Sequence, residues 1–114
     1  MIIGIGLDVV HVSRLERWQK IPGLLDRYFH PEELKTALSR GSGATLSLAA
    51  RFAAKEAFGK AIGTGLSGIT LKNILVWNNH SGKPCMELFG NALEALRAVG
   101  GVTVHVSLTH ERDN

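Results

Sequence analysis

Residues 45–62, TLSLAARFAAKEAFGKAI, decide the fold, because they carry the longest helical signal in the chain. Alanine recurs at every fourth position of this stretch, at Ala49, Ala53, Ala57 and Ala61. Side chains four residues apart share one face of a helix, so these alanines form a smooth stripe that permits close approach to a sheet. The glycines at positions 63 and 65 then end the helix. We therefore predict a long helix packed on a sheet.

The chain before this helix opens with alternating residues from position 2 to position 10. The apolar members of the alternation are Ile3, Ile5, Leu7 and Val9. Between them stand Gly4, Gly6 and Asp8. A period of two places these sets on opposite faces of a strand, so we predict a first strand here.

Two short helices should follow this strand. The first spans about residues 13–20 and has its basic side chains on the polar face. Pro22 and Gly23 stop it. The second helix begins at Pro31, because proline suits the first helical position, and Glu32 and Glu33 suit the positive end of the helix dipole.

The C-terminal half predicts a hairpin, a helix and a last strand. Two strand-like runs at residues 69–77 and 85–89 flank a turn at residues 81–84. Residues 91–99 indicate a helix closed by two glycines, and residues 102–108 alternate again. Helices early and paired strands late are typical of an α+β fold with a small, largely antiparallel sheet. At 114 residues, the chain forms a single domain, residues 1–114.

Composition excludes several classes of protein. Thirteen Lys and Arg against ten Asp and Glu give a net charge of +3, but the basic residues are scattered and no nucleic-acid-binding signature occurs. No apolar run is long enough to span a bilayer, and residues 1–10 lack the basic start of a secretion signal. The single cysteine, Cys85, suits a reducing compartment, so we expect a cytoplasmic protein without membrane or nucleic-acid partners.

Asp8 is the first candidate for chemistry, because aspartate is depleted in strands and this one shares a face with two glycines. Glycines inside a strand often mark the close approach of a ligand or another backbone. A carboxylate beside bare backbone suits a magnesium–phosphate site. The alternative is that Asp8 only ends the strand and caps the next helix.

Glu56 and Lys60 form a second candidate, one turn apart on the long helix. Their order favours an ordinary surface ion pair. Gly59 and Gly63 lie on the same side, however, and glycine within a helix costs about 1 kcal/mol relative to alanine. Something that needs room beside this face would explain them, although Gly63 also suits a helix C-terminus.

The histidines near the C-terminus give a third candidate. We expect His105, on the polar face of the last strand, to be a hydrogen-bonded structural residue, and His110 lies near that strand's end. Neither a zinc spacing, nor a nucleophile elbow, nor a phosphate-binding glycine loop is present. The residues by themselves therefore indicate a small magnesium–phosphate enzyme and no more.

Taken in order, these blocks resemble the holo-acyl-carrier-protein synthase family. The matching blocks are Gly4 to Asp8 followed by Arg14, Arg51 to Lys60, Gly63 to Gly65, Gly82 to Pro84, and His105 to His110. The resemblance implies transfer of 4′-phosphopantetheine from coenzyme A to a serine of apo-acyl carrier protein, with release of 3′,5′-ADP, in support of fatty acid biosynthesis. It also implies a homotrimer with active sites at the subunit interfaces.

The resemblance implies roles for individual residues as well. Asp8 and Glu56 match the family's Mg²⁺ ligands, and Lys60 matches a lysine near the transferring phosphate. Arg51 and His110 match positions that hold coenzyme A. Arg14, with Arg17 beside it, matches a contact to the acidic helix of the carrier protein. The base that takes the serine proton stays open between Glu56, a metal-bound water and Glu33.

Two departures from the family pattern bear on these expectations. Similar proteins continue for about one more strand beyond the position of Asn114, so we expect a C-terminal strand to be missing. The loop at residues 41–44 is nearly uncharged, where relatives often carry basic residues that contact phosphate. The rival interpretation is a non-catalytic basic domain that binds acidic protein or nucleic-acid surfaces through Arg14, Arg17 and Lys20.

Overall fold

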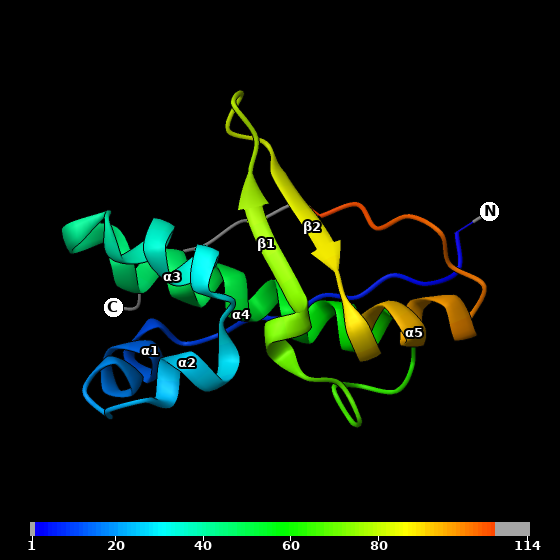
Figure 1. Ribbon diagram of the computed structural model, residues 1–114, viewed down its shortest axis with the longest axis horizontal. Coiled ribbons are helices and arrows are strands. Elements are labelled where there is room, and N and C mark those ends of the chain that lie inside the picture. The colour runs from blue at the N-terminus through cyan, green and yellow to red at the C-terminus, as the bar shows by residue number, and fades with distance from the viewer. Residues whose placement is uncertain (1, 107–114) are drawn as a thin grey trace.

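The long predicted helix is present and is the central element of the structure. A computed structural model describes residues 2–106 of the chain. Its helices and strands are α1 (Val12–Gln19), α2 (Leu24–Tyr28), α3 (Pro31–Leu38), η1 (Gly41–Gly43), α4 (Ala44–Ala61), η2 (Leu71–Asn73), β1 (Ile74–Asn78), β2 (Pro84–Leu88) and α5 (Gly90–Ala98). Figure 1 shows α1, α2 and α3 gathered at one end of α4, and the hairpin and α5 towards the other end. Among the described helices, none is both long and apolar enough to cross a membrane.

The predicted hairpin is confirmed. β1 and β2 pair antiparallel, with Ile74 opposite Leu88 and Trp77 opposite Cys85. The Asn79 side chain accepts hydrogen bonds from the backbone N–H groups of Ser81 and Lys83, which closes the turn. β1 begins at Ile74, later than the predicted residue 69, because residues 71–73 form a 3-10 turn that leads into it. This sheet and its helices confirm the α+β class.

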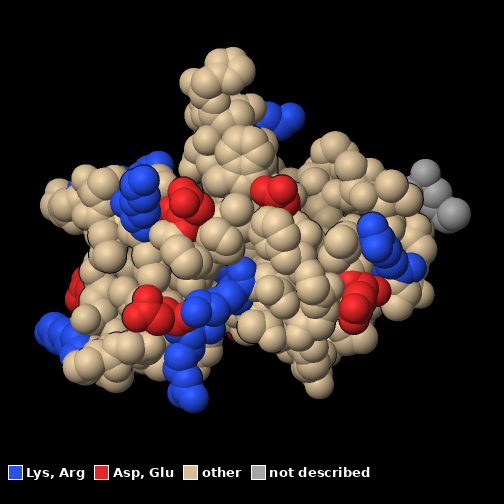
Figure 2. Space-filling model, in the orientation of Figure 1, with Lys and Arg blue, Asp and Glu red and all other residues tan. Residues whose placement is uncertain are grey.

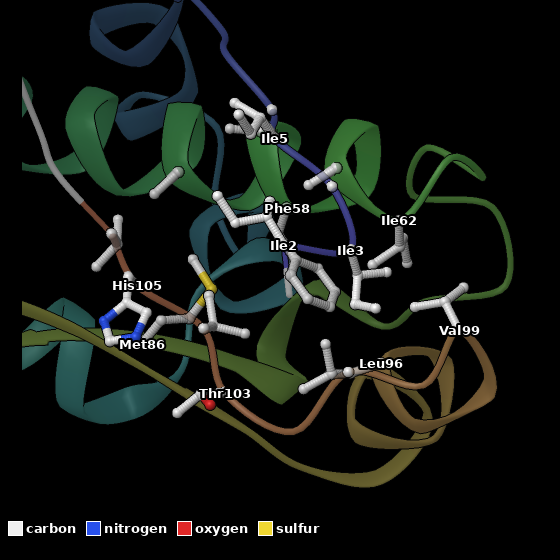
Figure 3. Close-up of a pocket in the computed structure, with 18 of the residues that line it drawn as sticks. Ile2, Ile3, Ile5, Phe58, Ile62, Met86, Leu96, Val99, Thr103 and His105 are labelled. Atoms are coloured by element: carbon white, nitrogen blue, oxygen red, sulfur yellow. The ribbon is translucent and has the colours of Figure 1, made fainter.

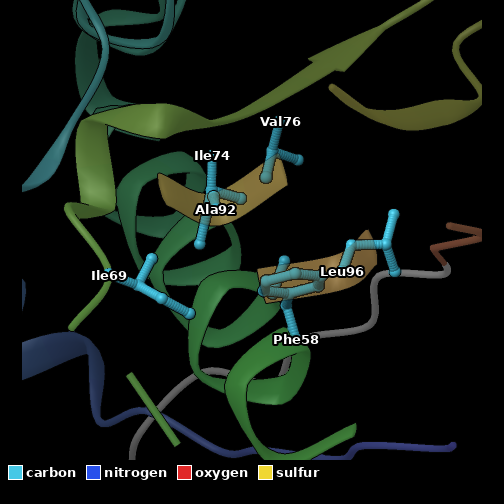
Figure 4. Packing of buried hydrophobic residues seen from close by; sticks show 7 residues of the cluster. Phe58, Ile69, Ile74, Val76, Ala92 and Leu96 are labelled. Carbon is cyan, nitrogen blue, oxygen red and sulfur yellow. The ribbon is translucent and has the colours of Figure 1, made fainter. Parts of the chain in front are cut away.

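Two apolar clusters hold the domain together, and α4 contributes to both. The first joins α4 to β1 and α5 through Ala54, Phe58, Ile69, Ile74, Val76, Ala92 and Leu96 (Figure 4). The second joins α4 to the N-terminal helices through Leu15, Phe29, Ala37, Leu48, Ala49 and Phe52. A helix packed on several sides needs small side chains where neighbours approach, which explains its alanine content.

The two predicted terminal strands are wrong for the residues that the structure describes. Neither residues 2–10 nor residues 101–106 form a strand, and residues 107 and 108 lie outside the described range. The first segment instead lies extended along α4 (Figure 1). A Cβ atom at Gly4 or Gly6 would overlap the carbonyl oxygen of Ala61 or Ala57, respectively. The alanine stripe therefore receives this backbone, and not a hydrogen-bonded sheet, because only glycine permits so close an approach.

Candidate active site on the long helix

Asp8 reaches α4 and forms an ion pair with Lys60. The Lys60 Nζ atom donates a hydrogen bond to Asp8 Oδ1 at 2.6 Å and another to the Leu7 carbonyl oxygen at 3.2 Å. The Lys60 side chain is 55% exposed and that of Asp8 is 15% exposed. The alternative that Asp8 caps α1 does not hold, because the residue before α1 is His11.

Glu56 lies one helical turn before Lys60, and the two side chains do not form the surface ion pair that their spacing favours. Lys60 bonds to Asp8 instead, and the half-buried Glu56 bonds to no side chain among residues 2–106. Gly4 packs on Ala61 and Gly6 packs on Ala57. Because each two residues of the extended segment pass one turn of α4, Asp8 comes beside the turn that carries Glu56. The Asp8 carboxylate and the Lys60 ammonium group therefore meet at one place on α4, and Glu56 lies one helical turn from Lys60.

The chemistry of this donor set fits a hard divalent cation. Magnesium usually binds one or two protein carboxylates and completes its octahedral shell with phosphate oxygens and water. Asp8 and Glu56 supply two carboxylates, and no group of three or more His, Cys, Asp or Glu residues occurs in the described part of the chain. The pair suits a cation that arrives with a phosphorylated ligand better than one held by protein alone.

Gly59 makes room for the protein's own loop. The Gly65 N–H donates a hydrogen bond to the Gly59 carbonyl oxygen at 2.9 Å. An added Cβ at Gly59 would lie 2.6 Å from the Gly65 carbonyl carbon. Gly63 has a φ of 86°, which glycine adopts readily where a helix ends. These two glycines therefore serve loop packing and helix termination.

Arg51 points into the protein. Its Nε atom donates to the Val76 carbonyl oxygen at 3.2 Å, and its Nη1 atom donates to the backbone and hydroxyl oxygens of Ser47. Its Nη2 atom donates to Asn78 Oδ1 at 3.2 Å. Burial lowers the pKa of Arg51 from its ordinary value, and Arg40 acts in the same direction. This geometry argues against direct contact with coenzyme A, because the guanidinium is buried and already bonded to β1 and α4.

Arg14 and Arg17 lie exposed on α1, as the sequence predicts. The Arg14 guanidinium lies 6.0 Å from the centre of the Trp18 ring, a cation–π contact that orients it along the helix surface. On the face shown in Figure 2, basic and acidic side chains are interspersed. No large single-sign field is visible on that face, so any attraction of an acidic partner by α1 is local.

Of the two C-terminal histidines, the structure describes His105 but not His110. His105 is exposed and makes no hydrogen bond to another residue between 2 and 106, so the expectation of a hydrogen-bonded structural residue is wrong. Its neighbours Val104 and Val106 turn inward and pack on the first apolar cluster, as the alternation predicts. His110 lies outside the described residues.

A cavity of about 760 Å³ separates the N-terminal segment from residues 99–106. Ile3, Ile5 and Phe58 line one part of it, and Leu96 and Met86 lie across from them (Figure 3). Asp8 and His105 also line the cavity. The lining is thus mostly apolar, with an acidic and a basic side chain among its members.

A buried ion pair on the core side of α4 was not predicted from the sequence. Lys55 Nζ lies 2.6 Å from Glu33 Oε1, and both side chains are fully buried. Glu33 is therefore excluded as the base that takes a substrate proton. The available signal was the spacing of Lys55 from Phe52 and Phe58, three residues away on either side, which places this charge on the core face of the helix.

Comparison with known proteins supports the resemblance. A family model described as the 4′-phosphopantetheinyl transferase superfamily matches residues 4–102. A holo-[acyl-carrier-protein] synthase of Treponema denticola is 59% identical over 112 residues, which cover 98% of this chain and 91% of that protein. The crystal structure of the synthase from Neisseria meningitidis superimposes with a TM-score of 0.86 at 39% identity, covering 99% of this chain and 92% of that one.

A second solved structure bears on ligands. The holo-(acyl-carrier-protein) synthase of Bacillus anthracis was solved in complex with CoA (3′,5′-ADP). It matches with a TM-score of 0.71 and 36% identity over 79% of this chain and 78% of that chain. The residues Asp8, Glu56 and Lys60 thus occur in a chain that is similar to a protein solved with CoA (3′,5′-ADP).

Proposed function

The chain belongs to the 4′-phosphopantetheinyl transferase superfamily, and we propose that it is a holo-acyl-carrier-protein synthase. It transfers 4′-phosphopantetheine from coenzyme A to a serine of apo-acyl carrier protein. The observation that supports this assignment at the level of residues is the ion pair between Asp8 and Lys60. Glu56 lies one turn before Lys60 on α4. Cytoplasmic action in fatty acid biosynthesis is part of the proposal, and the lone cysteine is compatible with that compartment.

The reaction is a phosphoryl-type transfer. The serine Oγ atom bonds to the phosphorus on the pantetheine side of the coenzyme A pyrophosphate, and the bond from that phosphorus to the bridging oxygen breaks. The leaving group is 3′,5′-ADP, and the serine proton passes to a base. Catalysis of such a step consists mostly of positioning and charge stabilisation.

Magnesium is the cofactor we propose, with Asp8 and Glu56 as its protein ligands. When bound, it neutralises pyrophosphate charge and fixes the orientation of the diphosphate. Asp8 holds its carboxylate at the site because Gly6 lets the extended segment lie directly on α4. Glu56 is the remaining side-chain candidate for the base, since Glu33 is buried and bonded.

Lys60 is the proposed electrostatic catalyst. Its exposed ammonium group extends from the last turn of α4 and already contacts the carboxylate that we assign to the metal. A cation at this position stabilises the charge that builds on the leaving phosphate. Such stabilisation acts mainly on kcat, because the charge develops only in the transition state. His110 remains a proposed coenzyme A contact.

The carrier protein is proposed to dock on α1. Arg14 and Arg17 are exposed on this helix and offer cations to an acidic partner surface. Their contribution should lie mainly in the rate of association and should weaken with salt.

A homotrimer with shared sites is also part of the proposal. Ile5, Leu7 and Val9 are 76%, 82% and 89% exposed, and Val102 is 90% exposed. Large apolar side chains exposed together on two neighbouring segments favour burial against another subunit. Asp8 lies in the same segment, so such an interface would adjoin the site.

Mass spectrometry of the carrier protein tests the function. The chain is incubated with coenzyme A, Mg²⁺ and an apo-acyl carrier protein, and the carrier should gain the mass of one phosphopantetheine group. The Asp8→Asn protein serves as the control that should leave the carrier unmodified. Binding of the carrier without any mass change would favour the non-catalytic basic domain.

A further inference from the structure

Lys55 donates hydrogen bonds to four other elements of the fold, and the proposed reaction does not use it. Its fully buried ammonium group donates to Tyr28 O at 3.0 Å, Glu33 Oε1 at 2.6 Å, Leu71 O at 2.8 Å and Ile74 O at 2.7 Å. These acceptors belong to α2, α3, η2 and β1, respectively. One side chain of α4 therefore ties four other elements to the helix.

Glu33 completes this arrangement. Its Oε1 atom also accepts from the His30 N–H at 2.9 Å, and its Oε2 atom accepts from the Val76 N–H at 3.1 Å. No buried side-chain nitrogen or oxygen in the described part of the chain lacks a hydrogen-bond partner. Both side chains are fully buried and therefore out of reach of a ligand, so the role of the pair is structural or positional.

A buried ion pair adds little net stability, because the cost of desolvating both charges offsets their attraction. Apolar side chains of similar volume often serve stability equally well. The pair instead fixes a position, because four acceptors held on four elements share the three N–H donors of the Lys55 ammonium group. The rotation of α4 about its own axis is therefore set at this point.

Glu56 lies between Lys55 and Ala57, the residue whose carbonyl group contacts the N-terminal segment. Successive residues of a helix are 100° apart, so Glu56 projects between the directions of Lys55 and Ala57. The Ala57 carbonyl contacts the backbone at Gly6, two residues before Asp8. A rotation of α4 would move the Glu56 carboxylate relative to Asp8, and the two flanking contacts oppose that rotation.

We propose that Lys55, with Glu33 as its counterion, is a positioning residue that fixes α4 and holds Glu56 in register with Asp8 for binding a divalent cation. The proposal rests on the proposed function only in taking Asp8 and Glu56 as the cation ligands. It assigns a role in the reaction to a pair that touches neither substrate nor metal.

Binding of Mn²⁺ by the purified protein in the presence of saturating coenzyme A, followed by electron paramagnetic resonance, tests this role without relying on turnover. The test variant is Lys55→Met combined with Glu33→Gln, which removes both members of the pair together, so that neither is left as a buried charge without its counterion. Its dissociation constant for Mn²⁺ should rise by about 10- to 100-fold, the loss typical of groups that orient metal ligands. Excess Mn²⁺ should restore most of the transfer activity.

Leu96→Ala on α5 is the matched control. Leu96 is buried in the first apolar cluster and is not bonded to the Lys55 anchor, so its truncation lowers the melting temperature without loosening α4 at Lys55. Its Mn²⁺ affinity should stay within about twofold of wild type. If the double variant does not fold, Glu33→Asp, which keeps the negative charge and shortens the side chain by one methylene group, should show a smaller shift in the same direction.

The outcomes distinguish the positioning role of Lys55 and Glu33 from the assignment of Asp8 and Glu56 as cation ligands. Wild-type Mn²⁺ affinity in folded Lys55 and Glu33 variants would overturn the positioning role while leaving the proposed site intact. An equal loss of affinity in Leu96→Ala would reduce the pair to a contributor to stability. If Asp8→Asn and Glu56→Gln bind Mn²⁺ as wild type does, the assignment of the cation site itself fails.

Discussion

Lys60 Nζ lies 2.6 Å from Asp8 Oδ1, although 52 positions separate the two residues in the chain. The contact forms because Gly4 and Gly6 let the N-terminal backbone lie on the carbonyl groups of α4. The contact places residues 4–8, the first block that matches the family, against the helix that carries Glu56. A side chain larger than hydrogen at Gly6 would push Asp8 away from this helix.

Loss of either proposed cation ligand should stop transfer. Asp8→Asn and Glu56→Gln each remove one charged oxygen donor, and the loss of activity should exceed the ~10- to 100-fold that an outer-shell change costs. Neither side chain is buried in an apolar cluster, so the circular dichroism spectrum and melting temperature should stay close to wild type. Near-normal turnover of both variants at modest Mg²⁺ would refute the assignment.

Lys60→Met should lower kcat by about 100-fold or more, the loss seen when one preorganised donor to a developing charge is removed. The KM for coenzyme A should change much less, because the interaction is strongest in the transition state. Lys72→Met is the matched control, since Lys72 is exposed and carries the same charge. Steady-state kinetics with both variants checks this, and equal effects would point to loss of general charge.

Arg14→Glu should weaken use of the acidic carrier protein by about tenfold at low salt. Coenzyme A binding should be unchanged, because the reversal alters an exposed docking face and not the phosphate site. Arg97→Glu, at an exposed position on α5, is the control and should leave carrier use intact. Apparent KM values for the carrier across a salt series measure the effect, and an unaltered value at low salt would argue against this face.

The Lys55–Glu33 pair should give the protein a distinctive alkaline stability profile. Burial lowers the pKa of Lys55 below its ordinary value of 10.5, with Glu33 opposing part of that change and Arg51 adding to it. Between the lowered pKa and 10.5, the unfolded chain binds more protons than the folded one, so the free energy of unfolding rises as the pH rises. The cost of burying the charge is fully present below that window.

Urea unfolding at a series of alkaline pH values measures this slope. The Lys55→Met and Glu33→Gln double variant lacks the group, so wild type should gain stability relative to it as the pH rises towards 10.5. A stability difference that does not depend on pH in this range would contradict the assignment.

Mixed oligomers test the shared site. If each site draws on two subunits, a mixture of Asp8→Asn and His110→Ala proteins should regain a minority of wild-type activity. The reason is that some interfaces in the mixed trimers then contain neither substitution. Each variant alone should be inactive or nearly so. A fully active monomer by analytical ultracentrifugation, or no rescue in verified mixed trimers, would exclude a shared site.

Local patterns in the sequence determined α1, α3, α4 and α5, the hairpin and the chemistry-bearing blocks, but not the short helix α2. The alanine period gave α4 to within a residue or two, and the glycine-containing turn gave the antiparallel hairpin. Asp8, Glu56 and Lys60 were identified from residue type and order, because these signals depend on spacing along the chain.

Tertiary structure decided what those residues contact. Alternation at positions 2–10 predicts a strand, but only three-dimensional packing shows the segment lying on α4 and not pairing within the described residues. Lys60 has Asp8 as its partner instead of Glu56, and Arg51, matched to a ligand contact, is bonded inside the protein. Lys55 and Glu33 meet across 22 positions. Helical and strand periods reveal which face a side chain occupies, whereas the partner on that face depends on how distant segments pack.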